Sequence, residues 1–128
     1  MSYNLGVKKI TKSHEDYLEA IYILEAKKIK VQSVEIARLL GVSKPAVHKA
    51  MGELLEAGLI TKEKYSDVTL TDEGREIAKS VFEKHNEIKT FLIKLGVDEK
   101  TAESDCCQIE HVISDITLDK IKKFNQNN

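Results

Sequence analysis

The chain has 128 residues, 41% of them hydrophobic, with one proline and six glycines. This composition predicts one globular domain or two small units sharing a core, and it argues against a disordered chain or a loop-rich β protein. No apolar run approaches the ~20 residues of a membrane span, and the N-terminus lacks the apolar segment of a signal peptide, so we expect a cytoplasmic protein with no membrane partner.

The charges are unevenly distributed along the chain. The formal net charge of −1 argues against indiscriminate nucleic-acid binding, but residues 1–64 carry 11 Lys/Arg and 8 Asp/Glu, whereas residues 65–128 carry 9 and 13. The basic and acidic halves are expected to have different functions. The two cysteines, Cys106 and Cys107, are adjacent, which excludes a disulfide framework and leaves core packing, redox activity or metal binding.

Hydrophobic periodicity and capping residues predict a mainly α fold. In chain order, the expected helices cover residues 13–28, 33–41, 43–58, 71–96, 98–114 and 117–124, with Ser13, Ser33, Ser43 and Asp98 as N-caps. Two β-prone runs within residues 59–71 predict a hairpin, and residues 29–32 are a candidate edge strand.

Residues 33–71 have the order helix, short turn at Gly41, helix and hairpin, which is typical of a winged helix-turn-helix. The second helix is expected to enter the major groove of double-stranded DNA with its N-terminal residues nearest the bases. Small helical domains often contain two helices joined by a turn, but the turn glycine and the capping serines favour DNA binding. The predicted DNA-binding residues are Ser33, Ser43, Lys44, Pro45, Ala46, His48, Lys49, Lys62 and Lys64.

The stretch CCQIEH, residues 106–111, brings thiol, carboxylate and imidazole groups together. Cys107, Glu110 and His111 have the i, i+3, i+4 spacing that places side chains on one helix face. All three are good ligands for a borderline transition metal. A half-buried helix with a core cysteine and a solvated Glu–His pair is the alternative interpretation. Cys106 would point about 100° away from Cys107 and is expected to pack in the core.

Several separated segments carry a family resemblance: EDYLEAIYILEAKK, SVEIARLLGVSKPAVHKAMGELLEAGLI, LTDEGREIA, the pair Lys84 and His85, and CCQIEHVISD. Over residues 13–124 the sequence resembles the diphtheria-toxin-repressor / manganese-transport-regulator family of metal-activated transcriptional repressors. The resemblance implies a winged helix-turn-helix DNA-binding domain in residues 1–72, followed by an all-helical metal-binding and dimerisation domain in residues 73–128. It also implies a regulator and not an enzyme.

The resemblance further implies a set of metal ligands. The matching positions are Asp16, Glu19, His85, Cys107, Glu110 and His111, with Cys107 standing where the manganese branch has Glu. The ancillary site of the iron branch is not expected, because Lys89 stands where that branch has Glu and Glu103 where it has His. The implied cofactor is Fe²⁺ or Mn²⁺, one or two ions per subunit, since carboxylates and imidazole suit Mn²⁺ and a thiolate moves the preference toward Fe²⁺ and later metals.

The leading hypothesis is a repressor that binds a palindromic operator as a homodimer when loaded with Fe²⁺ or Mn²⁺ and controls metal-ion homeostasis. No small organic ligand is expected. A redox-responsive winged-helix regulator using Cys106 and Cys107 is the alternative. A metalloenzyme is a third hypothesis, but it would leave the wing and the recognition helix without a function.

Overall fold

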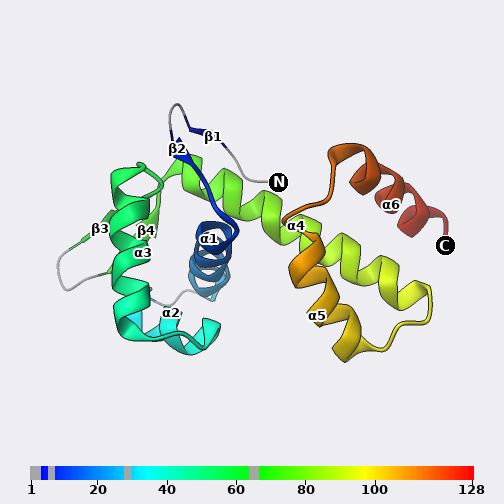
Figure 1. Ribbon diagram of the computed structural model, residues 1–128, viewed down its shortest axis with the longest axis horizontal. Coiled ribbons are helices and arrows are strands. Elements are labelled where there is room, and N and C mark those ends of the chain that lie inside the picture. Colours follow the sequence, from blue (N-terminus) through cyan, green and yellow to red (C-terminus); the bar gives the residue numbers. More distant parts are fainter. Residues whose placement is uncertain (1–3, 6–7, 28–29, 64–66) are drawn as a thin grey trace. The chain divides into compact units, whose positions relative to one another are not determined.

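The computed structural model describes residues 4–5, 8–27, 30–63 and 67–128 (Figure 1). Its elements are β1 (Asn4–Leu5), β2 (Lys8–Lys9), α1 (Lys12–Ala26), α2 (Ser33–Leu40), α3 (Lys44–Glu56), β3 (Ile60–Lys62), β4 (Val68–Leu70), α4 (Asp72–Lys94), α5 (Glu99–Ile109) and α6 (Asp115–Asn127). The prediction of a mainly α protein, with a winged helix-turn-helix followed by helices alone, is confirmed. No helix in these ranges is long and apolar enough to cross a membrane.

The chain forms two compact units, one ending at Lys79 and the other beginning at Ser80, so α4 contributes residues to both. The domain boundary expected between residues 72 and 73 stays a prediction. Each unit has its own buried core.

The first unit packs α1, α2 and α3 with the hairpin of β3 and β4. The hairpin is antiparallel with Ile60 opposite Leu70, and Val31 adds one bridge to Val68 at the position of the candidate edge strand. Every element contributes apolar side chains to the core, which include Leu18, Ile21, Ile36, Val47, Met51, Leu54, Leu59 and Ile60. This core fixes α3 while leaving its opposite face in solvent.

Capping residues explain where these helices begin and end. Ser43 caps α3 by accepting a hydrogen bond from the Ala46 amide at 3.2 Å, as predicted. Gly41 ends α2 in the left-handed conformation with φ 67°, which favours glycine. Two predicted caps are wrong: α1 is capped by Thr11 and not Ser13, and the N-cap of α2 is Gln32 and not Ser33.

The second unit packs the later part of α4 with α5 and α6. Its core contains Ile88, Cys106, Ile113, Leu118 and Ile121. The Phe91 and Phe124 rings meet edge to face, with centroids 5.2 Å apart, which joins α4 to α6.

The fifth helix is shorter than predicted. Asp98 caps α5 as expected, accepting a hydrogen bond from the Thr101 amide at 3.0 Å. The helix ends at Ile109, not at residue 114, and a turn follows before Ser114 caps α6. Glu110 and His111 therefore lie just beyond the helix that carries Cys107.

Candidate metal centre and nucleic-acid interface

His85, on α4 in the second unit, is the centre of a cluster of metal-binding groups. Its Nε2 lies 2.9 Å from Glu103 Oε2, and its Nδ1 lies 3.1 Å from Glu110 Oε1. The His85 side chain is only 14% exposed, and that of Glu110 only 1%. The imidazole is thus held between two carboxylates, one from α5 and one from the turn that follows it.

The two thiols complete this cluster. Cys106 Sγ lies 3.5 Å from His85 Nδ1, and Cys107 Sγ lies 3.9 Å from the same atom and 3.4 Å from Glu103 Oε2. Cys106 is fully buried in the core, as predicted, but its sulfur also faces His85. Burial, with a smaller contribution from the Glu103 carboxylate, raises the pKa of Cys106 to about 11.

Burial and the hydrogen bond to Glu103 likewise raise the pKa of Cys107 to about 12. Both cysteines are therefore protonated thiols at neutral pH when no metal is bound. A thiol in this state is a weak nucleophile, whereas a metal ion converts it to a thiolate ligand by displacing the proton.

Lys89 supplies the positive charge that neighbours this cluster. Its Nζ lies 2.9 Å from Glu103 Oε1 and 3.6 Å from Glu99 Oε1. The bond to Lys89 is the main reason that the pKa of Glu103 falls below its ordinary value, so this carboxylate is ionised. Lys89 and Glu103 thus form an ion pair at the edge of the cluster.

The donor chemistry fits a divalent transition metal. A neutral imidazole has one N–H, so His85 alone cannot donate to Glu103 and Glu110 together when both are ionised. Both contacts are favourable only if the imidazole carries a second proton, if one carboxylate is protonated, or if a metal ion lies between these groups. Imidazole, carboxylate and thiol are ligands for ions from Mn²⁺ to Zn²⁺, and the cluster holds all three within reach of one another.

The remaining predicted metal ligands lie on separate elements. His111 is buried in the turn after α5. Asp16 and Glu19 are half-buried on α1 in the first unit, three residues apart and so on one face of that helix. Of the six predicted ligands, His85, Cys107 and Glu110 are brought together within the second unit.

The predicted DNA-binding residues lie mainly on exposed surface of the first unit. Ser33 is half-buried as the first residue of α2, and Lys64 lies outside the described residues. The others are exposed at or near the N-terminal half of α3, or on β3: Ser43, Lys44, Pro45, Ala46, His48, Lys49 and Lys62. Their exposure leaves a basic edge of α3 accessible to a phosphate backbone.

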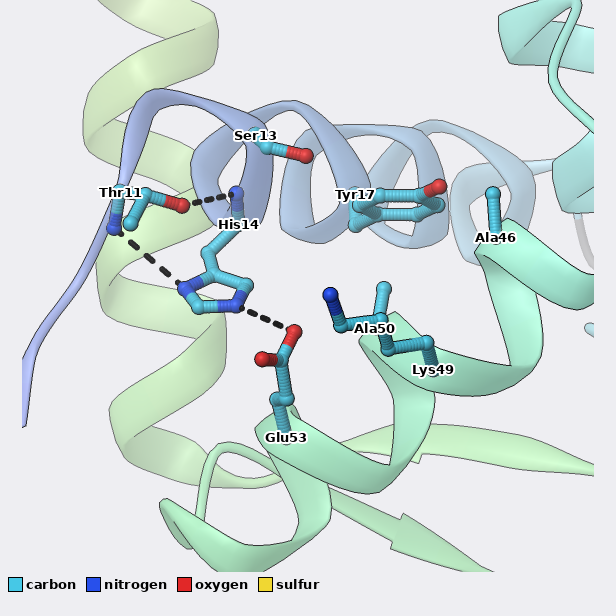
Figure 2. A pocket seen from close by; sticks show the side chains of 8 residues that line it. All are labelled: Thr11, Ser13, His14, Tyr17, Ala46, Lys49, Ala50 and Glu53. Carbon is cyan, nitrogen blue, oxygen red and sulfur yellow. Dashed lines mark hydrogen bonds and ion pairs between the residues drawn. The ribbon is translucent and has the colours of Figure 1, made fainter.

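A hydrogen-bonded histidine holds α3 against the start of α1. His14 Nε2 lies 3.1 Å from Glu53 Oε1, while its Nδ1 accepts from the Thr11 amide at 3.4 Å (Figure 2). His14 thereby links these two helices. Beside it, α1 and α3 line a pocket of about 310 Å³, with Tyr17 on one wall and Lys49 on the other.

Sequence reasoning missed Glu103 and Cys106 as members of the donor cluster. Glu103, Cys106 and Cys107 have the same i, i+3, i+4 spacing that singled out Cys107, Glu110 and His111. That spacing was available in the sequence. The approach of His85 from α4 was not, because it depends on how two helices pack.

Comparisons with known proteins agree with this architecture. Residues 9–68 match the family described as iron dependent repressor, N-terminal DNA binding domain, and residues 71–128 match iron dependent repressor, metal binding and dimerisation domain. An uncharacterized HTH-type transcriptional regulator of Methanocaldococcus jannaschii is 39% identical over 117 residues, covering 90% of this chain and 94% of the relative.

Two further relatives are described as regulators. The HTH-type transcriptional regulator MntR of Bacillus subtilis is 35% identical over 111 residues, covering 87% of this chain and 78% of the relative. The structure of the manganese regulator SloR superposes with a TM-score of 0.81 at 32% identity, covering 90% of this chain but 54% of that one, so this chain spans about half its length. The chain therefore belongs to the diphtheria-toxin-repressor / manganese-transport-regulator family, whose members are metal-dependent transcriptional regulators and not enzymes.

Proposed function

We propose that the chain is a cytoplasmic repressor that binds a palindromic DNA operator as a homodimer when loaded with Fe²⁺ or Mn²⁺, and that it controls metal-ion homeostasis. The observation that carries the proposal is the cluster of imidazole, carboxylate and thiol donors around His85. It occurs in a chain that also exposes basic residues at the N-terminal half of its recognition helix.

The proposed activating ligands are Asp16, Glu19, His85, Cys107, Glu110 and His111. Asp16, Glu19, Glu110 and a Cys107 thiolate each carry one negative charge, so clustering them without a cation is unfavourable. One divalent ion offsets two of these charges and two ions offset all four, which is compatible with one or two metals per subunit. Similarity to manganese regulators supports a metal that prefers oxygen ligands, such as Mn²⁺. Cys107 supports Fe²⁺, because a thiolate binds Fe²⁺ better than Mn²⁺.

Metal binding is proposed to act by restraining the DNA-binding unit. Asp16 and Glu19 belong to the unit that carries α3, whereas His85 and Cys107 belong to the other unit. Ligands drawn from both units would limit where each recognition helix points, so that a dimer fits two half-sites about one helical turn apart. A preference of ~3 kcal/mol for this geometry would shift its population by roughly two orders of magnitude.

We propose that exposed apolar side chains of the second unit form the dimer interface. Val112 and Ile116 are 75% and 76% exposed, although both are large hydrophobic residues. They lie on either side of Ser114, in the turn after α5 and at the start of α6. A second copy that covered them would remove this apolar surface from water.

The test is metal-dependent DNA binding by a variant with an altered cluster. A duplex is first enriched from a random-sequence pool with anaerobic protein and Fe²⁺ or Mn²⁺. We expect Glu110→Gln to lose most of the metal response while its circular dichroism matches that of the parent protein. Glu83→Gln, at an exposed position on α4, is the matched control and should bind normally. A parent protein that binds the duplex equally with and without metal would refute the proposal.

The redox alternative has less support. Redox-sensing cysteines are accessible and have a lowered pKa, whereas Cys106 is buried and both thiols have a raised pKa. A redox sensor would lose its response to oxidant in Cys106→Ser and keep its DNA binding in a metal chelator. A metal-dependent repressor would lose DNA binding in the chelator.

A further inference from the structure

A second set of donors on α5 overlaps with the proposed activating ligands at Cys107. Glu103, Cys106 and Cys107 lie within the helix, at i, i+3 and i+4, and face His85 on α4. One donor atom from each of these four residues lies within 4.8 Å of each of the others. Unlike the activating set, all four belong to the second unit.

The distances in this set are those of a small tetrahedral site. Bond lengths of about 2.3 Å to sulfur and 2.0–2.1 Å to nitrogen or oxygen place the sulfur atoms of a zinc site about 3.5 Å from its nitrogen or oxygen ligands. Cys106 Sγ lies 3.6 Å from His85 Nε2, and Cys107 Sγ lies 3.4 Å from Glu103 Oε2. Only small movements are needed to enclose an ion.

The charges also balance for a divalent ion. Two thiolates and the Glu103 carboxylate carry three negative charges, of which a divalent ion offsets two. Lys89 offsets the third, because its ammonium lies 2.9 Å from Glu103 Oε1. Glu103 Oε2 is the oxygen that faces His85 and Cys107, so Lys89 also orients this carboxylate toward the other donors.

We propose that His85, Glu103, Cys106 and Cys107 form a zinc-binding site, confined to the second unit, which shares His85 and Cys107 with the activating site. Two thiolates and one imidazole favour Zn²⁺ over Mn²⁺, which prefers oxygen ligands. The regulatory consequence rests on the proposed function. Zinc at this site occupies His85 and Cys107 without using Asp16 or Glu19, so it competes with the activating ion and does not restrain the DNA-binding unit.

The site is tested by measuring metal affinity in the 128-residue chain without DNA. Anaerobic Co²⁺ is titrated first, because thiolate–cobalt charge-transfer bands and strong visible bands report tetrahedral sulfur coordination, and Zn²⁺ then displaces it. We expect Glu103→Gln and Cys106→Val each to weaken Zn²⁺ binding by about tenfold or more, and to change Mn²⁺ affinity by less than about threefold. Asp105→Asn removes one negative charge at an exposed position on the same helix and is the control, which should leave both affinities unchanged.

Two results would overturn the proposal: unchanged Zn²⁺ affinity and cobalt spectrum in Glu103→Gln, or equal losses of Zn²⁺ and Mn²⁺ affinity. Cys106 lies in the core, so if Cys106→Val does not fold, Glu103→Gln decides the question alone, since the Glu103 side chain is 45% exposed. Because the affinities are measured without DNA, failure to bind DNA with Fe²⁺ or Mn²⁺ would refute the proposed function but not the zinc site.

The regulatory consequence has its own measurement. Adding Zn²⁺ to the Mn²⁺-loaded parent protein should weaken binding to the enriched duplex, and Glu103→Gln should resist this effect. Equal inhibition of both proteins would refute competition at this site.

Discussion

Gly74 allows the first turn of α4 to pack directly on the backbone at the start of the wing. A Cβ atom at this position would lie 2.0 Å from the Leu59 carbonyl oxygen. Even close carbon–oxygen contacts are about 3.3 Å long, so Gly74→Ala requires a displacement of more than an ångström. The same oxygen accepts a hydrogen bond from the Thr71 amide at 3.0 Å, and Thr71 Oγ1 in turn accepts one from the Gly74 amide at 3.1 Å.

The expected effect of Gly74→Ala is a net loss of stability. Overpacking against a fixed backbone lowers the free energy of unfolding by about 1–3 kcal/mol or more. The higher helix propensity of alanine raises it by up to about 1 kcal/mol. We therefore expect a net destabilisation of about 1–2 kcal/mol. At about 4 °C per kcal/mol for a chain of this size, the melting temperature should fall by about 4–8 °C in a calorimetric or circular-dichroism melt.

Gly52→Ala is the matched control. Gly52 is also inside a helix, but its added Cβ would have no atom within 4 Å apart from its own helix and chain neighbours. Alanine should stabilise α3 here by about 0.5–1 kcal/mol. Suppose that Gly74→Ala melts at or above the temperature of the parent protein while Gly52→Ala behaves as expected. The first turn of α4 would then not lie as close to the Leu59 carbonyl as described.

Three further predictions concern DNA, metal and assembly. Replacing both Lys44 and Lys49 with alanine should reduce the slope of log K against log salt by up to about two contacts, roughly 0.9 each, in a fluorescence-anisotropy titration. The parent protein should respond to Fe²⁺ at least as well as to Mn²⁺, and Cys107→Glu should shift the affinity ratio toward Mn²⁺ in anaerobic calorimetry, because a hard carboxylate replaces a thiolate. The double substitution Val112→Asp and Ile116→Asp should convert dimer to monomer in analytical ultracentrifugation, because the charges cannot be buried against a second copy without a large cost.

Controls make these outcomes decisive. Lys100→Ala with Lys120→Ala changes the net charge equally at exposed positions of the second unit and should leave the salt slope unchanged. An unchanged slope in the Lys44 and Lys49 variant would remove both residues from the DNA interface. An unaltered Fe²⁺/Mn²⁺ ratio in Cys107→Glu would show that Cys107 is not a ligand. A persistent dimer after both aspartate substitutions would place the interface elsewhere.

Sequence reasoning located elements well wherever a local signal determines the structure. Ser43 and Asp98 cap helices because a short side-chain oxygen at that position satisfies a backbone amide two or three residues later. The same reasoning failed at α1, where Thr11 and Ser13 are both suitable caps. Thr11 is the cap because His14 accepts a hydrogen bond from its amide and also bonds to Glu53 on another helix. The contact with Glu53 is a tertiary interaction, so local helix propensity could not predict it.

Tertiary packing determined what local patterns could not. The helical pattern of residues 98–114 has no break at Ile109, but α5 stops there and a turn leads Ile113 into the core with Ile88. The strands β1 and β2 have two residues each, too short for an alternating pattern to be detected. Helical spacing could have indicated Glu103 and Cys106, but only the packing of α5 on α4 shows that His85 is their neighbour.

The proposed zinc site would couple metal binding to the packing of the second unit's hydrophobic core through Cys106. Its sulfur faces His85 while the side chain packs among Ile88, Ile113, Leu118 and Ile121. The affinity for an ion bound to that sulfur would depend on how stably the core is packed, because metal binding and folding are thermodynamically linked. Substitutions at Ile121 or Leu118, which carry no donor atom, would then alter which metals the protein retains. In such a chain, selection for metal preference can act on aliphatic residues that are remote from any ligand.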